Sequence, residues 1–163
     1  QQGSCFSLVI PTEFVSEQEE STAQSIAVNH TPHILLVEDN ELNQLVLTRY
    51  LERNGCQVSL ARHGAQAVEQ VFQHPYDVVF MDCEMPIMDG FEAARQIRAR
   101  EMAENLSSVP IVALTALVME GTQQACKEAG MDAYLGKPAK PEDLMRYVQR
   151  YAAQQEPPVY KQA

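Results

Sequence analysis

From residue 33 onward, short apolar runs alternate with longer segments whose apolar positions recur at helical spacing. The richest runs contain β-branched residues and leucine without polar alternation, as is typical of parallel strands covered on both faces. The segments between them have the period of amphipathic helices, for example at Leu42, Leu45 and Val46. The pattern predicts strands within residues 33–39, 57–61, 77–82, 110–115 and 132–136, and helices at about 41–54, 64–74, 90–104, 119–129 and 141–153.

Turn residues support these limits. Gly55 and Gly130 stand where helix C-caps belong, and Pro141 stands at a predicted helix start. Five strand-helix units without a gap predict an α/β, doubly wound domain with a parallel sheet, because parallel strands need crossover helices.

The first 32 residues have a different character, with four Glu and no Lys or Arg. Residues 16–32 are rich in Ser, Thr, Glu and Gln, which is typical of a linker. Ahead of them, residues 6–10 alternate like a half-buried strand that ends at Pro11. We expect this strand to belong to a neighbouring domain.

The composition limits the partners. A hydrophobic fraction of 45% and a charged fraction of 21%, with no apolar run long enough for a membrane span, predict a soluble globular chain without membrane contact. A net charge of -10 excludes nucleic-acid binding through a basic surface and favours cations as small partners. The four cysteines show no metal-type spacing, so we expect free thiols and a cytoplasmic setting: Cys5, Cys56, Cys83 and Cys126.

Acidic residues stand at the ends of two of the predicted strands. The first run ends in Glu38 and Asp39, and the third ends in Asp82. In an open parallel sheet the carboxyl ends of the strands form one edge, so these carboxylates are expected to meet. Clustered carboxylates repel one another unless a cation neutralises them, and an oxygen-rich site of this kind suits Mg²⁺.

Two further residues belong to the same predicted edge. Thr115 ends the fourth run and Lys137 follows the fifth. With Asp82 as nucleophile, an acyl phosphate would form, Lys137 and the metal would neutralise charge on the transferred oxygens, and Thr115 would donate a hydroxyl hydrogen bond. Taken singly, each residue also fits an ordinary role as a cap, strand end or surface amine. Their coincidence at one edge favours a site.

Four sequence motifs across residues 33–153 resemble the receiver domain of two-component response regulators: LLVEDN, VFMDCEMPIMDG, VALTA and YLGKP. The resemblance implies a flavodoxin-like (βα)5 fold with strand order 2-1-3-4-5. It also implies that Asp82 is the phosphoacceptor. Mg²⁺ would be held by Asp39, Asp82 and the main-chain carbonyl of Glu84, and by Glu38 through water.

The same resemblance implies that Thr115 and Lys137 sense the phosphoryl group and that Tyr134 is an aromatic switch. We further hypothesise that the Glu84 side chain, close to the path of an attacking water, modulates the lifetime of the phosphoryl group. The apolar residues Leu42 and Leu45 of the first predicted helix are a hypothetical docking face for the histidine partner.

The segment GSCFSLVIP is similar to the last strand of the ATP-binding domain of histidine kinases. The expected organisation is a remnant of that domain (1–14), a linker (15–32), a receiver (33–153) and a tail or linker (154–163). This points to a hybrid sensor histidine kinase, in a two-component phosphorelay, with an inner-membrane anchor of the parent left open. The partners would be a histidine kinase core, a histidine phosphotransfer domain, or both.

Alternatives remain at this stage. The chain could be a stand-alone response regulator, a flavodoxin-type electron carrier or an aspartyl-phosphate phosphohydrolase. Its four histidines do not resemble a kinase phosphoacceptor box, so the chain itself is expected to catalyse only its own phosphorylation and dephosphorylation.

Overall fold

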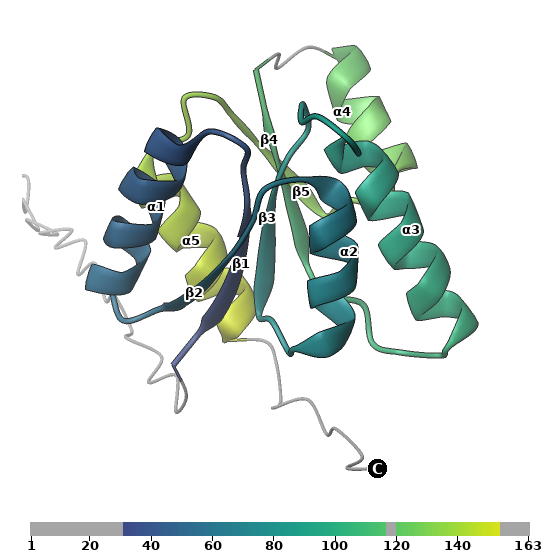
Figure 1. Ribbon diagram of the computed structural model, residues 1–163, viewed down its shortest axis with the longest axis horizontal. Helices are drawn as coiled ribbons and strands as arrows, with labels where there is room; N and C mark the ends of the chain where they lie inside the picture. Colours follow the sequence, from purple (N-terminus) through teal and green to yellow (C-terminus); the bar gives the residue numbers. More distant parts are fainter. Residues whose placement is uncertain (1–30, 117–119, 154–163) are drawn as a thin grey trace, which may run out of the picture.

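Five strands form one parallel sheet in the order β2-β1-β3-β4-β5 (Figure 1). The structure is a computed structural model that describes residues 31–116 and 120–153. The predicted strand order is confirmed. The strands are β1 (His33–Val37), β2 (Gln57–Ala61), β3 (Val78–Asp82), β4 (Ile111–Thr115) and β5 (Ala133–Gly136).

Each predicted helix is present, with limits within one residue of those expected. The helices are α1 (Glu41–Arg53), α2 (Gly64–Gln73), α3 (Gly90–Ala103), α4 (Glu120–Glu128) and α5 (Pro141–Ala152). Gly55 and Gly130 have φ of +82° and +81° just beyond the ends of α1 and α4, where a left-handed residue closes the helix.

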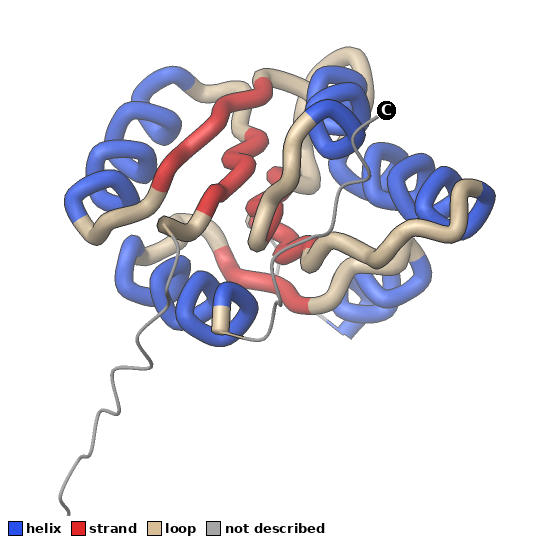
Figure 2. Tube along the Cα trace, turned by 90° about the horizontal axis from the view of Figure 1, so that it is seen from below, coloured by secondary structure: helices blue, strands red, loops and turns tan. Residues whose placement is uncertain are grey.

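Helices cover both faces of the sheet. The cluster on one face takes its helical residues from α1 and α5, and the cluster on the other from α2, α3 and α4. Figure 2 shows helices on both sides of the row of strands. All five residues of β3 and of β4 are buried, which explains why these runs carry no polar alternation.

Several predictions concern residues that the structure does not describe. The predicted kinase-domain strand (1–14), most of the linker (15–32) and the tail (154–163) fall in this group. Within the described residues, no helix has the length and apolar character needed to cross a membrane. Three cysteines are free and buried, as predicted: Cys56, Cys83 and Cys126.

Candidate functional site

Three carboxylates meet at the carboxyl ends of β1 and β3. These strands are direct neighbours, with Val37 opposite Met81, so the residues that follow Val37 lie beside the end of β3. Glu38, Asp39 and Asp82 each offer a carboxylate oxygen, and these oxygens lie within 4.8 Å of one another. Glu38 and Asp82 are only 1% and 2% exposed, while Asp39 is open to solvent. The predicted convergence of the three acids is therefore present.

Lys137 enters the same cluster from the segment after β5. Its Nζ donates to Asp82 Oδ2 at 2.5 Å and to Glu38 Oε2 at 3.1 Å. Its backbone N–H donates to the carbonyl of Thr115 at 2.7 Å, which joins the ends of β4 and β5 beside the site. Three carboxylates and one ammonium leave a formal charge of -2 in a largely buried place.

Burial and pairing shift the titration of the central pair in ways that the geometry explains. Burial raises the pKa of the Asp82 carboxyl above its ordinary value, and the hydrogen bond from Lys137 opposes part of that rise. Burial alone would lower the pKa of Lys137, but its hydrogen bonds to Asp82 and Glu38 outweigh burial and raise it. The lysine therefore remains a cation within the site.

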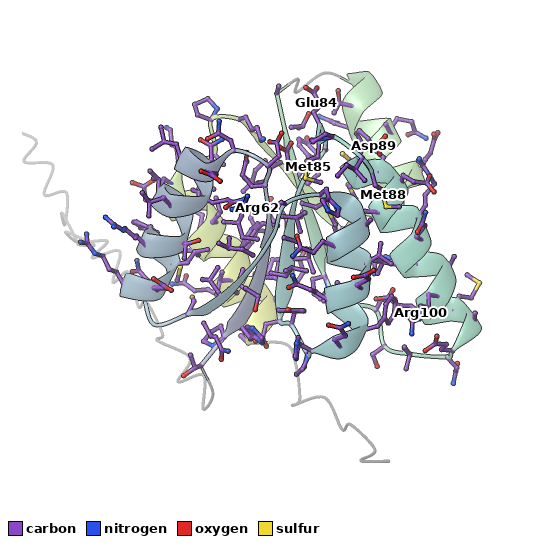
Figure 3. All side chains as sticks on the ribbon, viewed as in Figure 1. Arg62, Glu84, Met85, Met88, Asp89 and Arg100 are labelled. Atoms are coloured by element: carbon purple, nitrogen blue, oxygen red, sulfur yellow. The ribbon has the colours of Figure 1, made fainter. Side chains whose placement is uncertain are left out.

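The loop that follows Asp82 is folded tightly against it. The N–H of Glu84 donates to Asp82 Oδ1 at 3.0 Å, and the N–H of Gly90 donates to the carbonyl of Cys83 at 3.2 Å. A Cβ added at Gly90 would lie 2.1 Å from the carbonyl oxygen of Asp82, so only glycine fits there. Figure 3 shows the labelled loop residues together near the starts of α2 and α3, whereas Arg100 lies toward the far end of α3.

The other predicted site residues lie close to the cluster but contact it less directly. Thr115 ends β4 and is 3% exposed, so its hydroxyl lies inside the protein at the same sheet edge. Tyr134 lies opposite Ala113 in the β4–β5 register and packs, partly buried, against the core on the α2–α3–α4 face. The side chain of Glu84 is exposed, and the bond of this residue to Asp82 comes from its main chain.

Two residues of α1 that hold Glu38 were not predicted. Asn43 donates to Glu38 Oε1 at 3.1 Å, and Gln44 donates to the Glu38 carbonyl at 2.5 Å. Gln44 lies in the buried stripe of α1 with Leu47 and Leu51. A polar residue within an otherwise apolar helical stripe was the available indication, because such a side chain needs a buried partner.

The cluster suits a hard divalent cation. Its side-chain donors are oxygens alone, they carry excess negative charge, and the exposed Asp39 gives the site access to solvent. Mg²⁺ prefers carboxylate oxygens and keeps several waters, so an open site of this composition can hold it.

Sequence comparison identifies the family. A profile of the response regulator receiver domain matches residues 34–149. The chain belongs to the response regulator receiver family. The predicted fold class is thus confirmed by both the strand order and the family match.

Curated relatives of this receiver domain are much longer proteins. Hybrid signal transduction histidine kinase E of Dictyostelium discoideum is 43% identical over 112 residues, which are 66% of this chain and 7% of the relative. Sensor protein GacS of Pseudomonas syringae pv. syringae is 41% identical over 123 residues, which are 76% of this chain and 14% of that protein. The chain therefore spans a small part of the length of either relative.

Solved structures similar to this chain are also receiver domains. The receiver domain of a sensor histidine kinase from Pseudomonas aeruginosa PAO1 has 42% identity and a TM-score of 0.68, covers 77% of this chain and 100% of its own, and has a magnesium ion coordinated in its active-site cleft. The receiver domain of Saccharomyces cerevisiae Ssk1, solved with the histidine phosphotransfer protein Ypd1, has 30% identity and a TM-score of 0.72, covering 75% of this chain and 89% of its own.

Proposed function

We propose that this receiver domain accepts a phosphoryl group on Asp82 from a phosphohistidine in a histidine kinase core or a histidine phosphotransfer domain. The observation that carries the proposal is the position of Lys137, whose ammonium binds both Asp82 and Glu38 at the carboxyl edge of the sheet. A structural lysine would neutralise its carboxylates, whereas this site keeps a formal charge of -2 that suits a divalent cation.

In the proposed reaction an Asp82 carboxylate oxygen attacks phosphorus, the N–P bond breaks, and its electron pair returns to the imidazole nitrogen. The product is an acyl phosphate on Asp82. Lys137 already lies against Asp82 Oδ2, so its ammonium can neutralise charge on the phosphoryl oxygens without moving far. Thr115, buried at the end of β4, is the proposed hydroxyl donor to one of these oxygens.

The acidic cluster is the proposed metal site. Asp39, Asp82 and the main-chain carbonyl of Glu84 would hold Mg²⁺ directly, and Glu38 through water, since Glu38 is already occupied by Lys137 and Asn43. When bound, the ion would neutralise negative charge on the carboxylates and on the incoming phosphoryl group. The related Pseudomonas aeruginosa domain supports this assignment because magnesium lies in its active-site cleft.

The decisive experiment is phosphorylation by a small acyl phosphate with Mg²⁺, followed by intact mass. We expect one phosphoryl adduct on the wild type and none on Asp82→Asn, while Asp143→Asn on α5 serves as the control. An adduct that persists in Asp82→Asn would contradict the proposal. Continuous turnover of phosphate esters would instead support a phosphohydrolase.

The proposed conformational switch consists of Thr115 and Tyr134. The two strands that carry them are paired, and Tyr134 is only partly buried, so its ring has room to change its packing when Thr115 shifts toward a phosphoryl group. Tyr134→Phe tests whether the hydroxyl matters, and Tyr134→Ala tests the ring. Phosphorylation-dependent amide shifts on α4 and β5 that survive in Tyr134→Ala would contradict a switching role.

A docking face on α1 is the second part of the proposal. Leu42, Leu45 and Val46 are 67%, 47% and 51% exposed on the helix that follows the acidic pair. A phosphotransfer domain needs apolar contact near Asp82 to hold its histidine in line, and the Ssk1 receiver is solved in complex with such a protein.

The docking test compares two phosphodonors. In Leu42→Glu/Leu45→Glu, transfer from a cognate phosphohistidine protein is expected to fall, while phosphorylation by the small donor stays the same. Met102→Glu, which changes an 85% exposed methionine on α3, is the control. Unchanged protein-to-protein transfer in the double variant would contradict the docking face.

The Glu84 side chain is proposed to modulate dephosphorylation. It is exposed and follows Asp82 by two residues, so a carboxylate there can accept a hydrogen bond from an attacking water and orient it. Glu84→Ala and Glu84→Gln separate the effect of charge from that of size, and a dephosphorylation rate equal to wild type in both would contradict this role.

The parent protein is proposed to be a hybrid histidine kinase. The two curated relatives described above support this, as does the likeness of residues 1–14 to the end of a kinase ATP-binding domain. Residues 33–153 would then be its receiver. A parent sequence without a kinase core upstream would favour a stand-alone regulator.

A further inference from the structure

The start of α2 lies directly against the loop that follows Asp82. The N–H of Gly64 donates to the carbonyl of Met88 at 3.0 Å. A Cβ added at Gly64 would lie 2.8 Å from the carbonyl oxygens of both Met88 and Asp89, and 2.8 Å from Met88 Cγ. Real Cβ atoms essentially never come this close to such neighbours.

Backbone conformation does not explain this glycine. Its φ lies outside the left-handed region, and alanine is a much better helix former than glycine in a helical segment. Gly121 in α4 differs, because a Cβ there would meet nothing within 4 Å. The close approach of the loop is therefore what requires glycine at position 64.

The main chain of Met88 and Asp89, which a side chain at position 64 would contact, is held in place by other hydrogen bonds. Met88 donates its N–H to the Pro86 carbonyl at 2.8 Å in a tight turn. Asp89 is the N-cap of α3: its side chain accepts from the N–H of Glu92 at 2.8 Å, and its carbonyl accepts from Ala93 at 3.1 Å. A Cβ at position 64 would therefore have to displace the loop as a whole or push α2 away.

A displaced loop would reach the site. Gly90 closes the loop at its base, against the carbonyls of Asp82 and Cys83. Between that base and Met88 lies Glu84, whose N–H binds Asp82 Oδ1. Figure 3 shows Glu84, Met88 and Asp89 within this one short loop.

We infer that Gly64 is a positioning residue for the phosphoacceptor loop. By leaving space at the start of α2 and donating its N–H to Met88, it holds the loop in the position in which the N–H of Glu84 binds Asp82. The Glu84 carbonyl, which is the proposed main-chain ligand of Mg²⁺, belongs to the same loop. The inference rests on the proposed function of Asp82 and adds α2 to the elements that build the site.

The test is Gly64→Ala, compared with two other glycine substitutions. Gly55→Ala strains a residue with φ of +82° at the far end of α1 and so lowers stability without touching the loop. Gly121→Ala places a methyl group in open space. In Gly64→Ala we expect Mg²⁺ affinity, measured by calorimetry, to fall about tenfold, as for loss of a residue that orients metal ligands.

Two readouts do not depend on phosphorylation. In the metal-free Gly64→Ala protein, amide chemical shifts of residues 84–90 should change, while those of β5 and α5 stay as in the wild type. In the wild-type protein, Mg²⁺ should slow hydrogen exchange of the Gly64 amide, because ordering the loop strengthens its bond to Met88. The second readout needs no variant and remains valid should Gly64→Ala fail to fold.

The outcomes separate this inference from the proposed function. A wild type that gains no phosphoryl group on Asp82 defeats the proposed function. A working wild type with Gly64→Ala no weaker in Mg²⁺ binding than Gly55→Ala, and with unchanged loop shifts, overturns the positioning role. Gly64 exchange that is insensitive to Mg²⁺ in a working wild type overturns it as well.

Discussion

Arg98 of α3 is bound to segments that precede β4 and β5, and replacing it should strongly destabilise the fold. Its Nε donates to the carbonyl of Gly130 at 2.8 Å, and Nη2 donates to the carbonyl of Val109 at 2.9 Å and to Asp132 at 2.8 Å. Its Nη1 donates to Glu101 Oε2 at 2.7 Å. The perturbation is Arg98→Met, which keeps most of the apolar stem and removes the guanidinium.

The size of the expected loss in free energy of unfolding follows from the burial of Glu101. This carboxylate is 4% exposed, and apart from Arg98 it accepts one hydrogen bond, from the N–H of Val109 at 2.8 Å. Breaking a buried pair by removing one partner costs about 3–5 kcal/mol, because the remaining charge is left uncompensated. We expect Arg98→Met to lose an amount in this range from the free energy of unfolding.

The assay is urea unfolding followed by far-ultraviolet circular dichroism, since the chain contains no tryptophan to report by fluorescence. Arg95→Met on the same helix is the control. Arg95 pairs with Glu92 near the surface, where side chains are 53% and 46% exposed, so its loss should be about 0.5 kcal/mol or less.

A double-mutant cycle tests the explanation itself. Glu101→Gln removes the buried charge, so the double variant Arg98→Met/Glu101→Gln should be at least about 1 kcal/mol more stable than the two single losses predict together. A loss below about 1 kcal/mol for Arg98→Met, or additivity in the cycle, would refute the reasoning. The contacts of Arg98 lie at the amino ends of β4 and β5, away from Asp82, so phosphorylation of folded Arg98→Met should match the wild type.

Three further predictions concern other parts of the structure. Ile87 is 82% exposed with φ of +72°, so Ile87→Gly should raise the free energy of unfolding by about 1 kcal/mol in urea titrations, and an unchanged value would contradict the strain. Asp39→Asn removes one of three clustered like charges and should stabilise the metal-free protein by about 1 kcal/mol while weakening its stabilisation by Mg²⁺, both measured by thermal unfolding. Burial lowers the pKa of His33, so the folded protein takes up this proton less readily than the unfolded chain, and stability that is present above pH 6.5 falls as the pH drops through the folded value. His33→Gln should flatten this decline in urea titrations across that range, and an unchanged decline would contradict the role of His33.

Local patterns were sufficient to predict the elements of this fold. Apolar runs that are buried on both faces marked β3 and β4. Gly55 and Gly130 marked helix ends, and Pro141 marked a helix start. The convergence of Glu38, Asp82 and Lys137 could be predicted because topology alone brings the carboxyl ends of parallel strands to one edge.

Contacts between elements could not be predicted in this way. The partners of Arg98 lie up to 34 residues away, and nothing around position 98 distinguishes it from the exposed Arg95. Gly64 resembles any glycine at a helix start until the loop against it is known. The spacing of Leu42, Leu45 and Val46 correctly predicted a helix, but these three side chains are exposed. The buried face of α1 is instead formed by Gln44, Leu47 and Leu51.

The two edges of the sheet balance charge in opposite ways. At the amino edge, Arg98 is surrounded by acceptors, and both carboxylates that it contacts have additional backbone donors. At the carboxyl edge, Glu38, Asp39 and Asp82 lie together, and the ammonium of Lys137 contacts two of them, Glu38 and Asp82. The remaining negative charge opposes folding in the absence of a cation. A second lysine would reduce the repulsion, but it would also compete with a divalent cation for the same oxygens. The burial of all five residues of β3 offsets the repulsion and keeps Asp82 in place. Binding of Mg²⁺ should therefore raise the free energy of unfolding of this protein. Replacing one of the three carboxylates by its neutral amide should also raise the free energy of unfolding, while abolishing metal-dependent phosphorylation.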